Sequence, residues 1–227
     1  MISSAMMLVV VMAAVSLLLG KYTAAQLEQD GVRDLGEKLR LIRGMVEVSA
    51  AGLDEESEHF NQMFLSHFTE PFAAETVNGK PSIRHGATSL HGRTVEVDQF
   101  TALTKAVATV LVRDGNDFIR FSTSLRKENG ERSSGVPLGA AHPAVPRLLA
   151  GEGFSGLVRM FGKDYYARYT PIRDKTGLVI GAFFVGVDAT ADLVTLKKHI
   201  RDVRIGDTGY FYVLDAKPDK DFGSYVV

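Results

Sequence analysis

The chain contains no cysteine among its 227 residues. This absence excludes disulfide bonds and thiolate-based metal or redox sites, but it fits either side of a membrane. An excess of charge of one sign is also missing, because 26 basic residues face 27 acidic ones and the net charge is -1. Such a balance gives no electrostatic basis for binding nucleic acid, so we expect no nucleic-acid partner.

Charge is absent from residues 2–20, most of which are aliphatic. As a helix this segment would span about 28 Å, close to the hydrocarbon thickness of a bilayer, and we expect a transmembrane helix over residues 1–20. The alternative is a cleaved signal peptide, but no Lys or Arg precedes Lys21, and Thr-Ala-Ala at 23–25 matches a cleavage site poorly. The missing upstream positive charge also leaves the membrane orientation undecided.

A long amphipathic helix is predicted after this apolar segment. Apolar side chains recur at helical spacing between mixed charges, at Leu35, Leu39, Ile42, Val46, Ala50 and Leu53. The helical pattern continues over residues 54–67 and ends before Pro71, so we assign residues 21–70 to a helical stalk and packing helices. Two partners fit the apolar stripe: the sheet of the same chain, or a second copy in a homodimer.

Two histidines of this helical region, His59 and His67, are eight residues apart and close to acidic residues. A helical metal site favours histidines at i and i+4, or the pattern His-Glu-x-x-His, and neither is present. We therefore predict no metal site and no cofactor, and expect both histidines to be solvated or packed.

The middle of the chain predicts an antiparallel sheet. Paired apolar runs separated by short turn sequences, such as Asp114-Gly115-Asn116-Asp117, are typical of hairpins. The predicted strands are 108–113, 118–125, 156–161, 165–172 and 178–187, with loops over 75–92 and 127–139 and helices over 142–149 and 191–204. Consecutive hairpins favour an α+β fold with about five antiparallel strands over βαβ units. A further strand is expected over 209–214, and because residues 216–227 cannot complete a domain, we expect the chain to be truncated.

Three stretches together resemble a known family. They are TVLVRDGNDFIRFSTSL at 109–125, FGKDYYARYTPIRDKTGLVIGAFFVGVD at 161–188 and GDTGYFYVLDA at 206–216. They resemble the Cache family of extracellular sensor domains, above all the fusion of two Cache modules found in methyl-accepting chemotaxis proteins. The resemblance implies a PAS-like antiparallel sheet packed on the long N-terminal helix, with a small ligand held between the sheet and its overlying loops and helices. It assigns residues 71–189 to the ligand-sensing Cache module, 190–205 to a connecting helix and 206–227 to the start of a second, incomplete module.

Two arginines, Arg120 and Arg168, lie inside predicted strands. A guanidinium is rarely buried without a partner, because its desolvation is costly. These side chains are therefore expected either to face solvent or pair with Asp117 or Asp164, or to hold a ligand carboxylate through bidentate hydrogen bonds. Strict alternation along the strand predicts that Arg120 and Ser122 share one face of the sheet.

The resemblance favours the ligand interpretation. In related citrate and C4-dicarboxylate sensors, an arginine of the middle strand and an arginine just before a Thr-Pro-Ile run hold the ligand carboxylates. Arg120 and Arg168 match these positions, and Ser122 and Thr123 match sites where those sensors also offer hydrogen bonds.

One departure concerns the second cationic donor. Those sensors usually have His-Pro shortly after the first arginine, whereas this chain has Thr123-Ser124. Lys163 and His142 are the candidate replacements. Tyr165, with Tyr166 and Tyr169, is expected either to line the pocket or to pack as an ordinary core or rim residue.

Together with the anchor and stalk, the resemblance implies the extracytoplasmic sensor region of a bacterial chemoreceptor, which is expected to bind a small organic anion such as a carboxylate and to transmit the signal across the membrane. We expect it in the inner (cytoplasmic) membrane, with the sensing domain in the periplasm or outside the cell. The sequence has no glycine-rich phosphate loop, nucleophile elbow or zinc-protease helix, so no enzymatic activity is expected. The alternatives are the sensor region of a histidine kinase or diguanylate cyclase, and an anchored structural domain without a small-molecule ligand.

Overall fold

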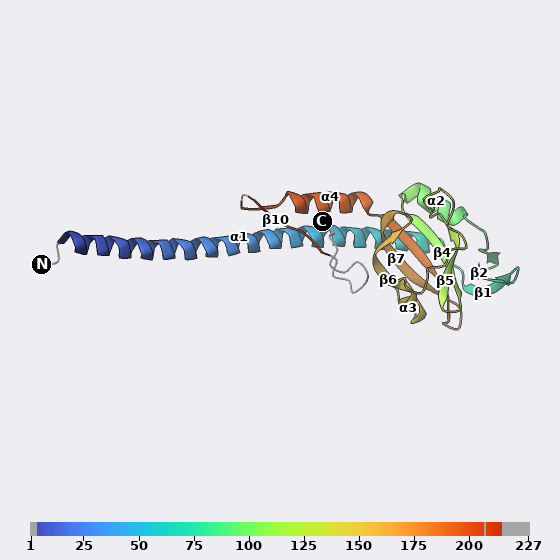
Figure 1. Cartoon of the computed structure of the whole chain (residues 1–227). Coiled ribbons are helices and arrows are strands. Elements are labelled where there is room, and N and C mark those ends of the chain that lie inside the picture. Colours follow the sequence, from blue (N-terminus) through green and yellow to red (C-terminus); the bar gives the residue numbers. More distant parts are fainter. Residues whose placement is uncertain (1–3, 207, 215–227) are drawn as a thin grey trace. The chain divides into compact units, whose positions relative to one another are not determined.

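The computed structural model describes residues 4–206 and 208–214 (Figure 1). Contacts within the chain divide it into two compact units, one formed by residues 49–194 and the other by residues 1–48 together with 195–227. The sheet and its covering helices belong to the first unit.

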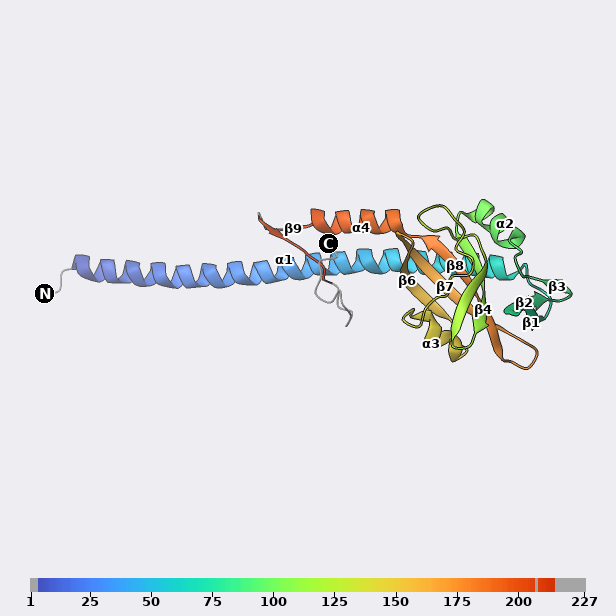
Figure 2. The same cartoon turned by 45° about the vertical axis from the view of Figure 1, so that its right-hand side comes forward.

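The larger unit is built around a five-stranded antiparallel sheet with the order β5-β4-β8-β7-β6 (Figures 1 and 2). Its strands are β4 (Val107–Asp114), β5 (Asp117–Thr123), β6 (Phe154–Met160), β7 (Lys163–Arg173) and β8 (Val179–Asp188). The central strand β8 is buried over nearly its whole length, because it lies between β4 and β7 and both of its faces are covered. The predicted α+β fold with a PAS-like sheet of about five strands is confirmed.

One face of the sheet, which carries Ala108 and Val185 and is named here the helix face, packs against the end of α1 (Ser4–Leu65) and against α2 (Val95–Thr104). Phe64 of α1 is fully buried, and its ring lies 5.0 Å from that of Phe100 in α2 and 5.7 Å from that of Phe183 in β8. Full burial of a side chain of this size contributes about 1.5–3 kcal/mol. The predicted packing of the long N-terminal helix on the sheet is therefore confirmed for its last turns.

The opposite face, named here the site face, carries Leu111, Ala167 and Phe184 and packs against α3 (Ala144–Leu149). Each face of the sheet therefore has its own hydrophobic cluster, and α2 and α3 lie on different sides of the sheet (Figures 1 and 2).

A β-bulge interrupts the pairing of β4 with β5. Leu111 lies opposite Arg120, but Val110 lies opposite Ser122, so the register shifts by one residue between the two pairs. Leu111 belongs to the site face and Val110 to the helix face, which places Arg120 and Ser122 on opposite sides of the sheet. The prediction that these two side chains share a face is wrong, because the extra residue of a bulge resets the alternation.

Residues 75–92, predicted to be a loop, contain strands. β1 (Phe72–Val77), β2 (Lys80–His85) and β3 (Thr88–Ser89) form a small antiparallel sheet. Asn78 and Gly79 join β1 to β2 with positive φ angles of 52° and 74°, the backbone that an Asn-Gly hairpin turn requires. The hairpin was not predicted, because the residues on either side of this turn are polar and show no hydrophobic alternation. Helix α2 was also not predicted, because only two of its ten residues, Val97 and Phe100, are buried and its apolar periodicity is weak.

The smaller unit contains the earlier part of α1 and most of α4 (Thr190–Asp202), as well as β9 (Arg204–Ile205) and β10 (Gly209–Tyr210), which pair antiparallel. The strand predicted over 209–214 is therefore confined to Gly209–Tyr210. Position 207 and positions 215–227 of the predicted second module lie outside the described residues.

The face of α1 predicted to form the dimer seam is only partly covered within the chain. Leu39 is 50% exposed and Val46 is 41% exposed. Ion pairs at i,i+4 spacing line the same part of the helix, at Arg33–Glu37, Asp34–Lys38 and Arg43–Glu47. That a second copy covers this face of α1 in a homodimer stays a prediction.

Among the described residues, no helix combines the length and the apolar character that crossing a membrane requires. Much of the predicted span over residues 1–20 lies outside the part of the chain whose side chains are described.

Candidate ligand-binding site

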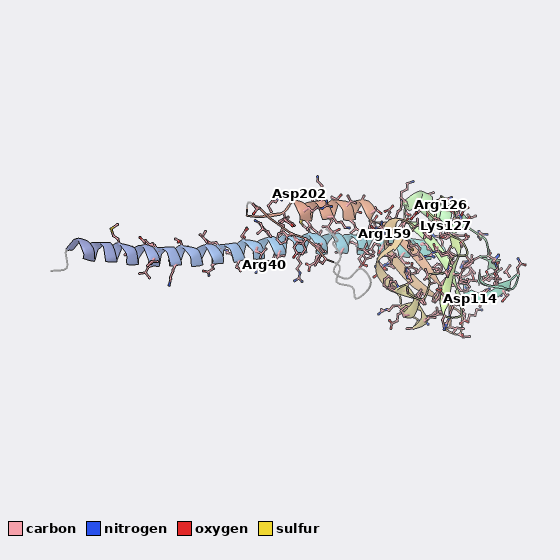
Figure 3. The ribbon with its side chains drawn as sticks, in the orientation of Figure 1. Arg40, Asp114, Arg126, Lys127, Arg159 and Asp202 are labelled. Carbon is pink, nitrogen blue, oxygen red and sulfur yellow. The ribbon has the colours of Figure 1, made fainter. Side chains whose placement is uncertain are left out.

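The segment that follows β5, residues 124–143, lies along this strand and is named here the covering segment. It binds β5 through the backbone: the Gly135 N–H donates to the Arg120 carbonyl at 2.7 Å, and the Leu138 N–H donates to the Phe118 carbonyl at 2.9 Å. Figure 3 labels Arg126 and Lys127 near its start. The segment leads into α3 and, with it, covers the site face at the β5 edge of the sheet.

Arg120 lies beneath this segment and is 5% exposed. Its Nη1 donates to the Pro137 carbonyl at 3.1 Å and, at 3.4 Å, to the Val136 carbonyl, while its Nη2 lies 3.4 Å from the Met160 sulfur. The guanidinium carbon is 5.9 Å from the centroid of the Phe161 ring. Among the described residues, no carboxylate forms an ion pair with Arg120. The two carbonyl oxygens accept from Nη1 and do not neutralise the charge of the guanidinium.

Burial lowers the pKa of Arg120, and the neighbouring Tyr169 and Asp117 partly oppose this shift. A buried cation that lacks a counter-ion is costly to maintain. Its fork of donors is suited to a carboxylate, which would supply the missing negative charge.

Tyr169 and His142 stand beside this guanidinium. Tyr169 is 1% exposed, and burial raises the pKa of its hydroxyl far above the ordinary value, so the hydroxyl keeps its proton. Burial, and then the charge of Arg120, lower the pKa of His142 from 6.5 to about 4, so its imidazole is neutral near pH 7. Arg120 is therefore the charged member of the three.

The tautomer of His142 follows from its hydrogen bonds. The Ala144 N–H donates to Nδ1 at 3.2 Å, so the proton of the neutral ring resides on Nε2. Nε2 lies 3.3 Å from the Tyr169 hydroxyl and donates to its oxygen. The hydroxyl's own proton has no acceptor among the described residues, so Tyr169 can donate to a ligand beside Arg120.

The other predicted residues of β5 are occupied within the protein. Ser122 lies on the helix face and donates to the Arg93 carbonyl at 2.5 Å. Thr123 lies on the site face, but its hydroxyl is 2.6 Å from that of Thr109, its partner in the strand pairing. Both side chains are buried and neither contacts Arg120 through a hydrogen bond among those described.

Lys163 and Tyr165 begin strand β7. Lys163 is largely exposed and forms an ion pair with Asp188 at 2.8 Å, which raises the pKa of the lysine. Tyr165 is buried on the site face, and this burial raises the pKa of its hydroxyl. Tyr165 therefore shares a hydrophobic cluster with Tyr169, whereas Lys163 belongs to an exposed pair.

Arg168 lies on the helix face, because it pairs with Val185 in the sheet. Its Nη2 is 2.6 Å from the Asp54 carboxylate and its Nη1 is 3.0 Å from that of Glu58, both on α1. The anticipated alternative partner, Asp164, instead pairs with Arg159 of the edge strand β6. Arg159 is labelled in Figure 3. The structure does not bring Arg120 and Arg168 together: the two guanidinium groups lie on opposite faces of the sheet.

Sequence reasoning missed two members of the Arg120 surroundings, Met160 and Phe161. Both belong to the β6–β7 turn region, some forty residues after Arg120, and no spacing links them to it. Phe161 and Gly162 have positive φ angles of 49° and 80° in this turn. The sequence Gly162-Lys163-Asp164 predicted the turn, but it did not predict that the turn lies beside Arg120.

Comparison with known proteins gives one extensive match. The family of the Cache 3/Cache 2 fusion domain matches residues 21–227. No curated protein matches the chain. Among solved structures, the sensor domain of DcuS from E. coli is similar, with 19% identity, coverage of 49% of this chain and 74% of that one, and a TM-score of 0.33.

Proposed function

Because this chain belongs to the Cache 3/Cache 2 fusion domain family, we propose that residues 49–194 bind a small organic anion, a carboxylate foremost, on the Arg120 side of the sheet. One observation carries the proposal: a guanidinium that is 5% exposed has no carboxylate partner among the described residues. A buried charge without a counter-ion is destabilising unless function retains it.

In the proposed complex, the ligand carboxylate replaces the Val136 and Pro137 carbonyls as the acceptor of the Arg120 N–H groups. Tyr169 donates its hydroxyl proton to the same anion, because His142 already donates to the hydroxyl oxygen. Hydrogen bonds to a charged group contribute about 1.5–3 kcal/mol each. The hydrogen bonds from Arg120 and Tyr169 to the carboxylate would therefore favour an organic anion over a neutral analogue.

Access to this site requires the covering segment to move. The Arg120 backbone is bonded to the segment through Val136 and Gly135, and its side chain through Val136 and Pro137. We propose that these hydrogen bonds keep the covering segment closed without ligand. A bound carboxylate would weaken those that the Arg120 side chain donates to the Val136 and Pro137 carbonyls. Ligand affinity for one of two arrangements would then shift their populations.

We propose further that the chain is the sensor region of a bacterial chemoreceptor, with residues 1–20 as the membrane anchor, the sensing module outside the cytoplasm and α1 as the seam of a homodimer. The uncharged stretch 2–20 and the exposed Leu39 and Val46 support these parts. A histidine kinase or a diguanylate cyclase is the alternative output. The role is binding and not catalysis.

Isothermal titration of the detergent-solubilised chain with acetate, lactate, succinate, malate and citrate tests the site. We expect at least one acid to bind, and Arg120→Gln to weaken its binding about 100-fold or more, in line with two lost charge-assisted hydrogen bonds. Arg173→Gln is the matched control, because the Arg173 side chain donates to the Gly151 and Gly177 carbonyls at the far end of β7. Unchanged affinity in Arg120→Gln, or the failure of every acid to bind, would contradict the proposal.

A further inference from the structure

Polar side chains join α1 to the sheet on the face opposite Arg120. On α1 they occupy positions i, i+3, i+4 and i+7, and on β7 they alternate, so each set lies on one side of its element. The group consists of Asp54, Ser57, Glu58 and Asn61 on α1 and Tyr166, Arg168 and Thr170 on β7. We name this group the polar seam.

Arg168 is the centre of the seam. Its Nη2 bonds the Asp54 carboxylate at 2.6 Å and the Asp54 carbonyl at 3.3 Å, and its Nη1 bonds Glu58 at 3.0 Å. Nε completes the set by donating to the Ser57 hydroxyl at 3.4 Å. Every nitrogen of the guanidinium therefore contacts the helix, which leaves Arg168 poorly placed to serve as an anion site.

Two further hydrogen bonds extend the seam along the strand. The Tyr166 hydroxyl donates to Asp54 at 3.0 Å, and the Thr170 hydroxyl donates to the Asn61 side-chain oxygen at 3.2 Å. Ser57 and Asn61 are buried, but the ion pairs of the polar seam reach water, because the Arg168 side chain is 19% exposed and those of Asp54 and Glu58 are 50% and 42% exposed. Partly hydrated ion pairs exchange protein partners for water at little cost.

The next turns of α1 bind the sheet differently. Phe64 is fully buried among Phe100, Phe183 and Phe68. Opening that contact would expose a large apolar area. Leu53 and Phe60 contact the same apolar cluster. The helix is therefore fixed by apolar contacts, most firmly at its Phe64 end, while its contacts with β7 over residues 54–61 are polar.

We infer that Arg168 is a clasp that holds residues 54–61 of α1 against β7 and that opens without unfolding of the sheet. Its position on the strand connects it to the candidate site, since Arg168 and Tyr169 are adjacent and project to opposite faces of β7. A displacement of β7 by an anion at Tyr169 would change the distances from Arg168 to Asp54 and Glu58. This coupling rests on the proposed function, whereas the clasp itself does not.

Hydrogen exchange followed by mass spectrometry on the detergent-solubilised chain tests the clasp without any ligand. In Arg168→Gln we expect exchange of residues 50–62 to rise at least tenfold, while β4 and β8 keep wild-type protection. Asp54→Asn combined with Glu58→Gln should reproduce the effect, and Arg168→Lys should be intermediate, because lysine keeps the charge but not the fork of donors. Arg173→Gln, on the same strand but bonded to the Gly151 and Gly177 carbonyls, should leave exchange unchanged.

Two results would overturn the inference: unchanged exchange of residues 50–62 in Arg168→Gln, or an equal loss of protection in β4 and β8, which would make Arg168 part of the global core. The coupling is tested by repeating the exchange with succinate, malate and citrate. An acid that binds in the titration should alter exchange of residues 50–62 in wild type but not in Arg168→Gln. Binding without that change would refute the coupling and leave the proposed anion site standing.

Discussion

Replacing Arg120 by methionine should stabilise the domain while abolishing anion binding. Arg120 is 5% exposed, and burial disfavours its charged form. Methionine fills a similar volume, removes the charge and can pack against Met160 and Phe161, which already contact the arginine.

The magnitude follows from two opposing contributions. Desolvation of an ion costs several kcal/mol even after relaxation of the protein. The hydrogen bonds to the Pro137 and Val136 carbonyls, at 3.1 and 3.4 Å, return part of this cost, and their loss leaves the Pro137 carbonyl to be solvated by movement of the covering segment. Since replacing buried ionic groups by apolar ones of similar volume is often stabilising by about 1–4 kcal/mol, we expect a gain of about 1–2 kcal/mol in the free energy of unfolding.

Urea denaturation of the wild-type and Arg120→Met chains measures this difference. Arg173→Met is the control, and its free energy of unfolding should stay within about 0.5 kcal/mol of wild type, because Arg173 is exposed. A loss of about 2 kcal/mol or more in Arg120→Met would refute the reasoning, since it would mean that the carbonyl contacts outweigh the desolvation of the charge and that Arg120 is a structural residue.

Other predictions concern the core and the pH dependence. Phe64→Ala should lower the free energy of unfolding by about 3–5 kcal/mol in urea, and Leu103→Ala, at a position 80% exposed, should change it little. Gly181→Ala should lower the melting temperature, because the added Cβ would clash with the Leu111 carbonyl oxygen; an unchanged value would contradict this. Between pH 6.5 and pH 4 the unfolded state binds a proton at His142 that the folded state does not, so stability falls as the pH falls through this window. His142→Gln should remove that part of the acid destabilisation, and parallel pH profiles of the two proteins would contradict the burial of a neutral imidazole.

The sheet was predictable because its turns are local. Asp114–Asp117 and the glycines at 162 and 177 fix the three hairpins of the five-stranded sheet through backbone preferences that neighbouring residues encode. The same rule applied to Asn78-Gly79, but there the flanking strands are polar and half-exposed, so hydrophobic alternation gave no supporting signal.

The candidate site was predictable only in part. An arginine inside a predicted strand pointed to Arg120 and to Arg168 alike. The bulge that turns Ser122 to the other face depends on the pairing of two strands, which no local pattern of β5 reveals. The partners of Arg168 lie more than one hundred residues earlier, on α1. Tertiary packing decides which face of the sheet an arginine side chain lies on and which carboxylate forms an ion pair with it.

The most direct measurement of the central claim is side-chain 15N NMR of the arginines during titration with the acid that binds. Arg120→Gln and Arg168→Gln spectra assign the two Nε resonances. The proposed site predicts that the Arg120 Nε–H resonance shifts in proportion to occupancy, because a carboxylate accepts from this guanidinium. An Arg120 resonance that stays unchanged at saturation would contradict the proposed site, whichever other arginine responds.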